Sequence, residues 1–388
     1  MPLGRGTRHT SAMALDLTAQ RVLRDVDVVA RAGLGLEEFL DESLASVARA
    51  VPHVGACFAT VDPSTLLLTG TLKFGELAKY ADTKDHEWGL MEYGTAEATS
   101  FIELAHRAVP AVATASQAGD SPRLNEFMRP NFGFADELRV VMRDRGECWG
   151  GLAMFRGETE DPFDERDVEL LASLSEAMSV GVRTAILGRL AILGPALPPL
   201  GPAVVIIGAA DEVLQMSVGA EERLGELLTH TNGSDPSGII TSLVGAARRF
   251  ARGETVRPPR SRVRARNGMW LVLHATPLSP RDGTHGDVVV TIEEARPPEI
   301  VPLVVAAFDL TQRERDVTER VLQGMDTKEI AAAMHLSSYT VQDHLKSVFT
   351  KADVRSRREL IARIYFDQYV PRMGTDVGPS GWFATTGS

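Results

Sequence analysis

The stretch "MHLSSYTVQDHLKSVF", from Met334 to Phe349, decides the fold of the C-terminal part of the chain. A helical projection at about 100° per residue puts four apolar side chains on one stripe. These are Val341, Leu345, Val348 and Ala352. The face directed away from that stripe carries Tyr339, Asp343, Lys346, Ser347 and Thr350. The pattern predicts a helix with one buried side and one side whose hydrogen-bonding groups need a function.

Helix starts around this stretch are marked by N-cap residues, and three of the caps are followed by Glu three positions later. The four are Thr311 with Glu314, Asp326 with Glu329, Ser337, and Ser356 with Glu359. Four short helices within about sixty residues predict a compact helical bundle. The second and third helices are joined by the short "HLS" turn, which is typical of a helix-turn-helix.

Ordered residues at fixed spacing run through this bundle: Leu310-Thr311, Arg313-Glu314, Gly324, Lys328-Glu329-Ile330-Ala331, Leu336-Ser337, Thr340-Val341, His344, Lys351 and Val354-Arg355-Ser356-Arg357. In these residues the chain resembles the LuxR-type helix-turn-helix family, over residues 306–370. The resemblance implies that the helix from Ser338 enters the DNA major groove and that Thr327 to Met334 form the scaffold helix. It also implies that the helix from Arg357 helps to pair two subunits on a roughly two-fold site.

The base-contacting positions of the family fall on Gln342, Asp343 and Lys346. Lys346 can donate to guanine, Gln342 can pair with adenine, and Asp343 can accept from cytosine. The family often has a basic residue where Gln342 stands, and Asp343 places a negative charge near phosphates. We therefore expect weak sequence-independent attraction and a heavy dependence on base readout.

Contacts with the DNA backbone, which position the module without specifying sequence, are expected from a second set of residues. These are Lys328, Thr340, His344, Lys351, Arg355, Arg357 and Arg358. Other interpretations remain open for several of them. Thr340 and His344 could be structural hydrogen-bonding residues, Arg357 and Arg358 could balance Glu359, and exposed Lys and Arg are commonly only solvated charges.

The composition limits the number of domains and the classes of partner that the chain can have. The chain has 388 residues, 44% of them hydrophobic and 24% charged, which indicates two to four soluble globular domains. The net charge of -11 restricts nucleic-acid binding to one locally basic module. No apolar run reaches the ~20 residues that cross a bilayer, and the N-terminus has no signal-peptide pattern. We expect a cytoplasmic protein without a membrane partner.

Two Pro-rich stretches, Gly194 to Pro202 and Ala295 to Pro302, are interpreted as linkers or domain edges because proline does not continue a helix or a central strand. The predicted order is an N-terminal helical or flexible segment (1–35), two sensor domains (36–190 and 202–296), the helix-turn-helix module (306–370) and a flexible tail (371–388). The fold class is multidomain, with two α+β domains ahead of an all-α four-helix bundle.

The first sensor domain alternates helical and strand-like patterns. The expected elements are a helix with Leu36, Phe39, Leu40, Leu44 and Val47 on one face, strands at Gly55 to Asp62 and Thr65 to Gly70, a hairpin at Asp136 to Arg156 turning at Arg145-Gly146, and a helix from Glu165 to Leu187. The strand Gly146 to Phe155 and the helix start Phe163 to Asp167 resemble a GAF domain. This resemblance implies a sensor of small molecules or proteins, and we call residues 36–190 the GAF-like region.

Residues 202–296 are expected to form strand, turn, strand, helix, a hairpin turning at Asn267-Gly268, and a last strand. That order resembles a PAS-type sensor, and we call these residues the PAS-like region. The helix from Glu165 to Leu187 has two equal interpretations, a dimer coil or a cover for its own sheet.

Four residues of the GAF-like region are candidates for a sensor pocket or a redox site. Cys57 and Cys148 could be a redox pair or a reactive thiol, but two small buried hydrophobes are favoured. Trp88 and Trp149 are candidates to line a pocket, although Trp149 fits the core better. The histidines match no metal motif, so no metal site is predicted and the cofactor is unknown.

The sequence thus predicts a transcriptional regulator and not an enzyme. The expected partners are double-stranded DNA, a second copy of the chain, a small-molecule effector and RNA polymerase. Two alternatives remain, a thiol-dependent reductase built on the GAF-like region and a protein-docking sensor without a small ligand. The signal, the operator sequence and the sign of regulation are not encoded in any recognisable pattern.

Overall fold

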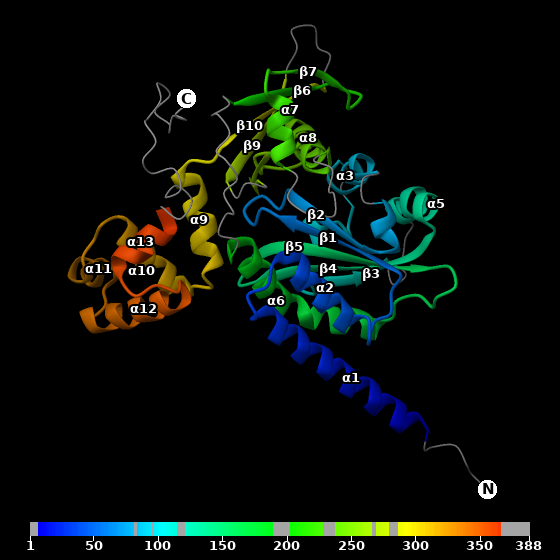
Figure 1. The fold of residues 1–388 in the computed structure, drawn as a ribbon, viewed down its shortest axis with the longest axis horizontal. Helices are drawn as coiled ribbons and strands as arrows, with labels where there is room; N and C mark the ends of the chain where they lie inside the picture. The colour runs from blue at the N-terminus through cyan, green and yellow to red at the C-terminus, as the bar shows by residue number, and fades with distance from the viewer. Residues whose placement is uncertain are drawn as a thin grey trace, which may run out of the picture. The chain divides into compact units, whose positions relative to one another are not determined.

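The computed structural model describes residues 7–80, 84–94, 97–114, 121–188, 202–227, 237–265, 269–278 and 286–365. The chain forms two compact units (Figure 1). One unit contains the GAF-like and PAS-like regions, and the other contains the helices that follow Glu294. The predicted fold class, two α+β regions followed by a helical bundle, is confirmed.

The GAF-like region is built on a sheet of five strands in the order β2-β1-β5-β4-β3. Their bounds are β1 Gly55–Val61, β2 Leu68–Gly75, β3 Ala111–Ala113, β4 Phe134–Asp144 and β5 Glu147–Gly157. The neighbouring strands of this sheet run antiparallel. Every residue of β1 is buried, and all but the two ends of β5 are too, so both faces of the sheet centre are covered.

Long helices cover one face of this sheet, and short helical segments lie toward the other (Figure 1). The long helices are α1 Thr7–Ala30, α2 Leu36–Val47 and α6 Glu165–Gly188. The short segments are η1 Glu76–Tyr80, α3 Asp85–Tyr93, α4 Phe101–Leu104, the π-helical turn η3 Arg123–Met128, and α5 Arg129–Phe132.

Local signals predicted most of these elements correctly. The five apolar residues expected on one face of α2 are all buried. Arg145 and Gly146 have φ angles of 49° and 86°, the left-handed pair that a two-residue hairpin turn requires. The second strand was predicted too early, because Leu66 has φ 63° in a turn and β2 begins only at Leu68.

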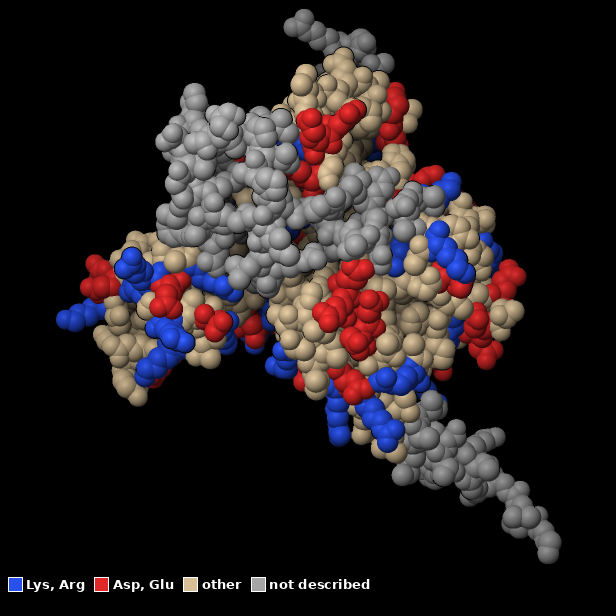
Figure 2. Space-filling model, viewed as in Figure 1, with Lys and Arg blue, Asp and Glu red and all other residues tan. Residues whose placement is uncertain are grey.

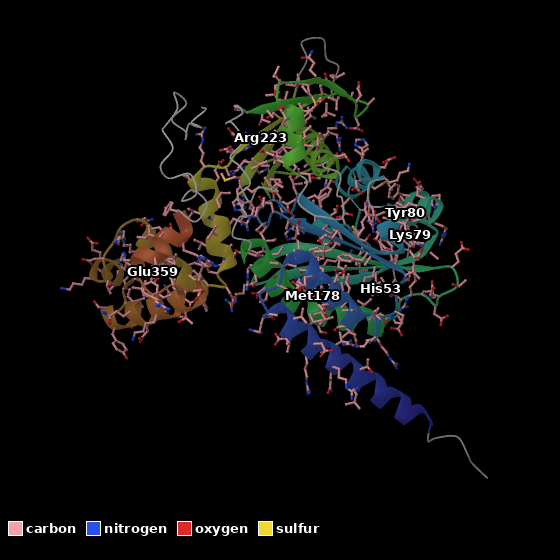
Figure 3. All side chains as sticks on the ribbon, in the orientation of Figure 1. His53, Lys79, Tyr80, Met178, Arg223 and Glu359 are labelled. Carbon is pink, nitrogen blue, oxygen red and sulfur yellow. The ribbon has the colours of Figure 1, made fainter. Side chains whose placement is uncertain are left out.

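The helix α6 covers its own sheet. It packs against β3, β4 and β5 and against α1 and α2. Leu171, Met178 and Val182, three of the four residues expected at the seam of a dimer coil, are 0% exposed within one chain, and the fourth, Val168, is half-buried (Figure 3 labels Met178). The dimer-coil interpretation of this face is therefore wrong, since a partner helix could not reach it.

The PAS-like region forms a second five-stranded sheet, ordered β7-β6-β10-β9-β8. Its elements are β6 Ala203–Ile207, β7 Val213–Met216, α7 Ala220–Glu226, α8 Ser237–Ala251, β8 Arg260–Arg264, β9 Trp270–Pro277 and β10 Val288–Glu294. The predicted order of strands and helix is confirmed. The predicted turn at Asn267-Gly268 lies outside the described residues.

The regular structure of the second unit between Pro297 and Tyr365 is helical. Its helices are α9 Pro297–Ala307, α10 Gln312–Leu322, α11 Thr327–Met334, α12 Ser338–Lys351 and α13 Arg357–Tyr365. The predicted caps are confirmed: Thr311, Asp326 and Ser337 accept the expected backbone hydrogen bonds, and Ser356 accepts one from Glu359.

The stretch Ala295 to Pro302 lies at a domain edge, as predicted, because the boundary between the two units falls between Glu293 and Glu294. It is not a linker, because α9 begins at Pro297. Proline is tolerated in the first helical turn, where its missing N–H would have no partner anyway. Pro297 and Pro298 occupy that turn, and Arg296 N donates to the Glu299 carboxylate at 2.7 Å. Most of the other Pro-rich stretch, residues 194–201, lies outside the described residues.

Candidate nucleic-acid interface and effector pocket

The helix α12 is positioned by its ends and by its apolar stripe. Its N-cap Ser337 accepts a hydrogen bond from Thr340 N at 3.0 Å, and His335, in the left-handed conformation at φ 54°, turns the chain from α11 into it. Val341 and Val348 are 0% exposed and Leu345 is 7% exposed. The buried side predicted from the sequence is therefore confirmed, and α12 packs on α10 and α11.

A buried carboxylate ties α12 to the start of α10. Glu314 accepts hydrogen bonds from Thr311 N at 2.7 Å, Ser347 Oγ at 2.6 Å and Lys351 Nζ at 2.7 Å. Burial favours the neutral acid, but these hydrogen bonds outweigh it and lower the pKa of Glu314 to about 2. Ser347 was expected to face away from the bundle, and that expectation is wrong because its hydroxyl serves this carboxylate.

The side of α12 opposite its stripe is open to solvent. The three predicted base-reading residues, Gln342, Asp343 and Lys346, are all exposed. Lys346 Nζ lies 3.5 Å from the Asp343 carboxylate, so the two charges partly neutralise each other. Tyr339, one turn closer to the helix start, is 71% exposed, and sequence reasoning gave it no role although a large exposed aromatic ring is unusual.

The predicted backbone-contacting residues fall into two groups. Lys328, Arg355 and Arg358 are exposed. The other four, which are Thr340, His344, Lys351 and Arg357, are half-buried. Thr340 shares a 2.8 Å hydrogen bond with Ser337, Lys351 holds Glu314, Arg357 Nη2 is buried without a hydrogen-bond partner, and His344 lies on the middle of α12. Their contacts with DNA remain predictions.

The charge of this module is nearly balanced. Ten Lys and Arg and nine Asp and Glu lie between Asp309 and Ile364, for a net charge of +1, whereas the whole chain carries -11. Both signs occur side by side on the face of the module that Figure 2 shows. A helix-turn-helix with this charge attracts phosphates only weakly, so recognition must come mainly from specific contacts.

The comparisons with known proteins concern this same module. Residues 309–364 match the model of the bacterial regulatory proteins of the luxR family. The spore germination protein GerE of Bacillus subtilis is 36% identical over 55 residues, which are 14% of this chain and 74% of that protein. The chain belongs to the luxR family.

Other similarities of this luxR-family protein cover smaller shares or are weaker. A putative transcriptional regulator of Aeromonas salmonicida is 49% identical over 51 residues, 13% of this chain and 26% of that protein. The chain thus spans about a quarter to a third of the first curated relatives it matches. The match to the solved GAF domain of a phosphoenolpyruvate-protein phosphotransferase from Coxiella burnetii covers 44% of this chain and 95% of that chain, with 17% identity and a TM-score of 0.29.

A small cavity of about 40 Å³ lies within the first unit, mostly in the GAF-like region. Cys57 and Trp88 line it, whereas Cys148 and Trp149 are not among its lining residues. Lys73, ion-paired with Asp85, lies 5.9 Å from the centre of the Trp88 ring. The cavity holds about one water molecule as it stands, because a liquid water takes ~30 Å³.

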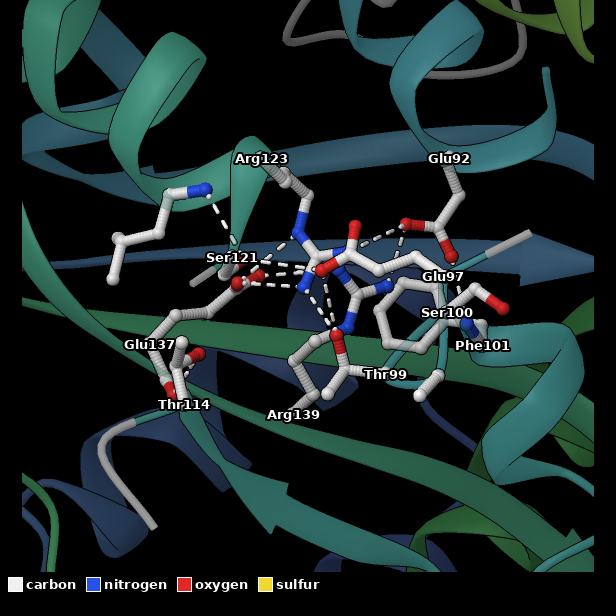
Figure 4. A network of polar contacts seen from close by, with 12 residues as sticks. Glu92, Glu97, Thr99, Ser100, Phe101, Thr114, Ser121, Arg123, Glu137 and Arg139 are labelled. Carbon is white, nitrogen blue, oxygen red and sulfur yellow. Dashed lines mark hydrogen bonds and ion pairs between the residues drawn. The ribbon is translucent and has the colours of Figure 1, made fainter. Parts of the chain in front are cut away.

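A buried ionic network borders this cavity (Figure 4). Arg123, on the π-helical turn, donates to Glu137 at 2.9 Å and to Glu97 at 2.9 Å. Arg139 donates to Glu92 at 2.7 Å and to Glu137 at 3.2 Å. Burial favours the neutral form of Glu137, but the two arginines lower the pKa of that carboxyl.

Sequence reasoning missed this network. Its signal was present in β4, where the charged residues Glu137 and Arg139 are two residues apart and therefore point to the same face of a largely buried strand. Arg139 also lies 3.9 Å over the ring of Phe101, the first residue of α4. The network thus connects the sheet to the short segments that line the cavity.

The two thiols are unsuited to redox chemistry. Both cysteines are buried, and burial raises the pKa of Cys57 to about 12 and that of Cys148 to about 11. Cys57 is opposite Ala153, which is five residues along β5 from Cys148, so the two are about 16 Å apart. A disulfide requires Cα atoms within roughly 7 Å.

Metal-ligand clusters and membrane-spanning helices are both absent from the part of the chain that the structure describes. No group of three or more His, Cys, Asp or Glu side chains among the described residues is arranged to hold a metal ion. None of the described helices is long and apolar enough to cross a membrane.

Proposed function

We propose that this protein is a DNA-binding transcriptional regulator that reads promoter DNA through α12 and takes its input through the GAF-like and PAS-like regions. The observation that supports it best is the exposed side of α12. Gln342 and Lys346 stand there one helical turn apart, on a helix whose opposite side is buried and whose start is capped. Membership of the luxR family supports the same reading.

The roles of the individual residues follow from their donors and acceptors. Lys346 donates to guanine and Gln342 pairs with adenine, while Asp343 accepts from cytosine or restrains Lys346 until DNA arrives. The backbone is anchored by Lys328, Thr340, His344, Lys351, Arg355, Arg357 and Arg358. A two-fold DNA site requires two copies, with α13 at the contact between them, and α13 has Leu360 and Ile364 buried on its inner side.

The sensor function rests on the cavity in the GAF-like region. A space bordered by Lys73, Asp85, Glu92 and Arg139 is suited to a small polar effector once the short helices around it move. The regulator carries out no reaction of its own in this proposal, because its two thiols are protonated and far apart. Since its target is genomic DNA, it acts in the cytoplasm, and RNA polymerase is the partner through which it would change transcription.

The test is fluorescence anisotropy of the full-length protein with a duplex selected from a genomic-fragment library and with random duplex, each at two salt concentrations. The double variant Gln342→Ala, Lys346→Ala should bind the selected duplex about 30-fold or more weakly, because each good base contact contributes ~1–3 kcal/mol. Binding of random duplex should change far less.

The matched control is Arg313→Ala, Gln323→Ala, which removes the same charge and amide from exposed positions of the same module. It should leave affinity for the selected duplex within about twofold. Equal losses in both double variants would show that charge and not base readout drives binding. Equal affinity of wild-type protein for the selected and random duplexes would contradict the proposal.

A further inference from the structure

A second cavity, of about 210 Å³, lies in the first unit where the GAF-like and PAS-like regions meet. Thr65 and His106 of the GAF-like region line it, together with Arg249 and Arg257 of the PAS-like region. At ~30 Å³ for each liquid water, the space would hold about seven waters, so it fits a small molecule and not a drug-sized one. The cavity near Trp88 is a separate site.

Four polar atoms of its lining residues are buried and lack a hydrogen-bond partner: Thr65 Oγ1, Tyr93 Oη, Arg249 Nε and Arg257 Nη1. Thr65 Oγ1 and Arg257 Nη1 have no hydrogen bond, and Thr65 is only 7% exposed. Nearly all buried polar groups in folded proteins are paired, and an unpaired one costs about 1–3 kcal/mol. A guanidinium N–H can only donate, so the missing partner must bring an acceptor oxygen.

The guanidinium of Arg257 is held in place from the other region. Its Nη2 lies 2.6 Å from His106 Nε2, a contact between residues 151 apart in sequence. Because guanidinium has no acceptor, the imidazole Nε2 must accept this bond. The remaining N–H groups of Arg257 are thereby oriented before any ligand arrives, which lowers the entropy cost of binding.

The charges and walls of the cavity limit the ligand further. The lining contains two acids, Glu103 and Glu254, and two arginines, Arg249 and Arg257. Arg249 Nε lies 3.4 Å from the Glu254 carboxylate, which also pairs with Arg252, so that glutamate is already neutralised. Leu67, Ile102 and Pro258 supply apolar wall. An anionic head beside Arg257 and a short apolar body against this wall would satisfy both halves of the site.

We propose that this cavity binds a small molecule with one carboxylate and a short apolar body, held by Arg257 and Thr65 across the junction of the two sensor regions. Tyr93 lines both this cavity and the cavity near Trp88, so one side chain separates the two sites. The chain would then have a second input that does not depend on the first cavity or on DNA binding.

Isothermal titration of the full-length protein with benzoate and with hexanoate tests the proposal, with benzamide as the uncharged analogue of benzoate. At least one carboxylate should bind, and benzamide should bind about tenfold or more weakly. Arg257→Gln and Thr65→Val should each weaken the carboxylate about tenfold, since a hydrogen bond to a charged group contributes ~1.5–3 kcal/mol. Arg166→Gln, which changes an exposed arginine of α6, should have no effect.

Three outcomes would overturn the proposal. These are absence of heat with both carboxylates at millimolar concentration, equal binding of benzamide, and unchanged affinity in the two lining variants. Circular dichroism of each variant checks its folding. If Arg257→Gln loses structure, the carboxylate affinity of Thr65→Val alone tests the proposal, because this substitution removes one hydroxyl without changing charge or shape.

Discussion

Glu314 offers the sharpest test of how α12 is held. Replacing it by Gln keeps the shape of the side chain but removes the charge that accepts from Lys351, Ser347 and Thr311. The pKa of Glu314 is about 2 in the folded protein and ~4.3 in an unfolded chain. At ~1.36 kcal/mol per pKa unit, the charged form contributes about 3 kcal/mol to folding at pH 7.

The sign of the pH dependence follows from the lowered pKa. The stabilisation is complete above pH ~4.3, where the unfolded carboxylate is ionised as well, and it is lost as the pH falls toward about 2. Glu314→Gln should therefore reduce the stability of α10 and α12 by about 3 kcal/mol at pH 7. The difference from wild type should shrink by roughly 1.3 kcal/mol between pH 4.3 and pH 3.

Hydrogen exchange of the full-length protein, read by mass spectrometry on peptides of α10 and α12 and corrected for intrinsic rates, measures this difference. Glu319→Gln, at an exposed position of the same helix, is the control and should change protection by less than ~0.5 kcal/mol. Equal protection in the two variants at pH 7 would refute the reasoning. So would a Glu314→Gln deficit that stays constant down to pH 3.

Three more predictions concern other parts of the chain. Asp343→Asn should free Lys346 and raise affinity for random duplex, with a salt slope steeper by about 1 in anisotropy titrations, and an unchanged slope would argue against the pairing. Asp62→Asn should cost about 3–5 kcal/mol in urea unfolding, because Asp62 forms a buried ion pair with an arginine of β8, whereas the exposed Asp161→Asn should cost little. Native Cys57 and Cys148 should resist N-ethylmaleimide at pH 7 and react in urea, because burial raises both thiol pKa values; rapid labelling of the folded protein would reopen the redox interpretation.

The parts of the fold that the sequence predicted are those governed by local chemistry. The caps at Thr311, Asp326 and Ser337 involve residues within one helical turn, and the turn at Arg145-Gly146 requires only two residues with positive φ. Such signals survive in any tertiary context. They therefore located α10 to α13 and the β4–β5 hairpin from the sequence alone, whereas α9 was missed because its prolines were interpreted as a break.

The parts that it missed depend on residues brought together by the fold. Arg123 and Glu137 pair across 14 positions and Arg139 and Glu92 across 47, and a charged residue is normally expected at the surface. Ser347 likewise seemed free on a helical projection, which cannot show that a carboxylate of another helix lies above it. The cavity beside Arg257 requires two regions to meet, and no single segment carries a signal for it.

The charge distribution bears on how such a regulator could be selective. The module from Asp309 to Ile364 has a net charge of +1, which leaves -12 on the remainder of the chain. Non-specific binding grows with the number of phosphates neutralised, so this chain should hold random DNA weakly and search it quickly. In the proposed function, specific binding then has to come from the few base contacts assigned to Gln342 and Lys346, made twice by the proposed two-fold pair. Any input that changes the pairing of two copies would therefore change promoter occupancy more strongly than an equal change in the affinity of one copy.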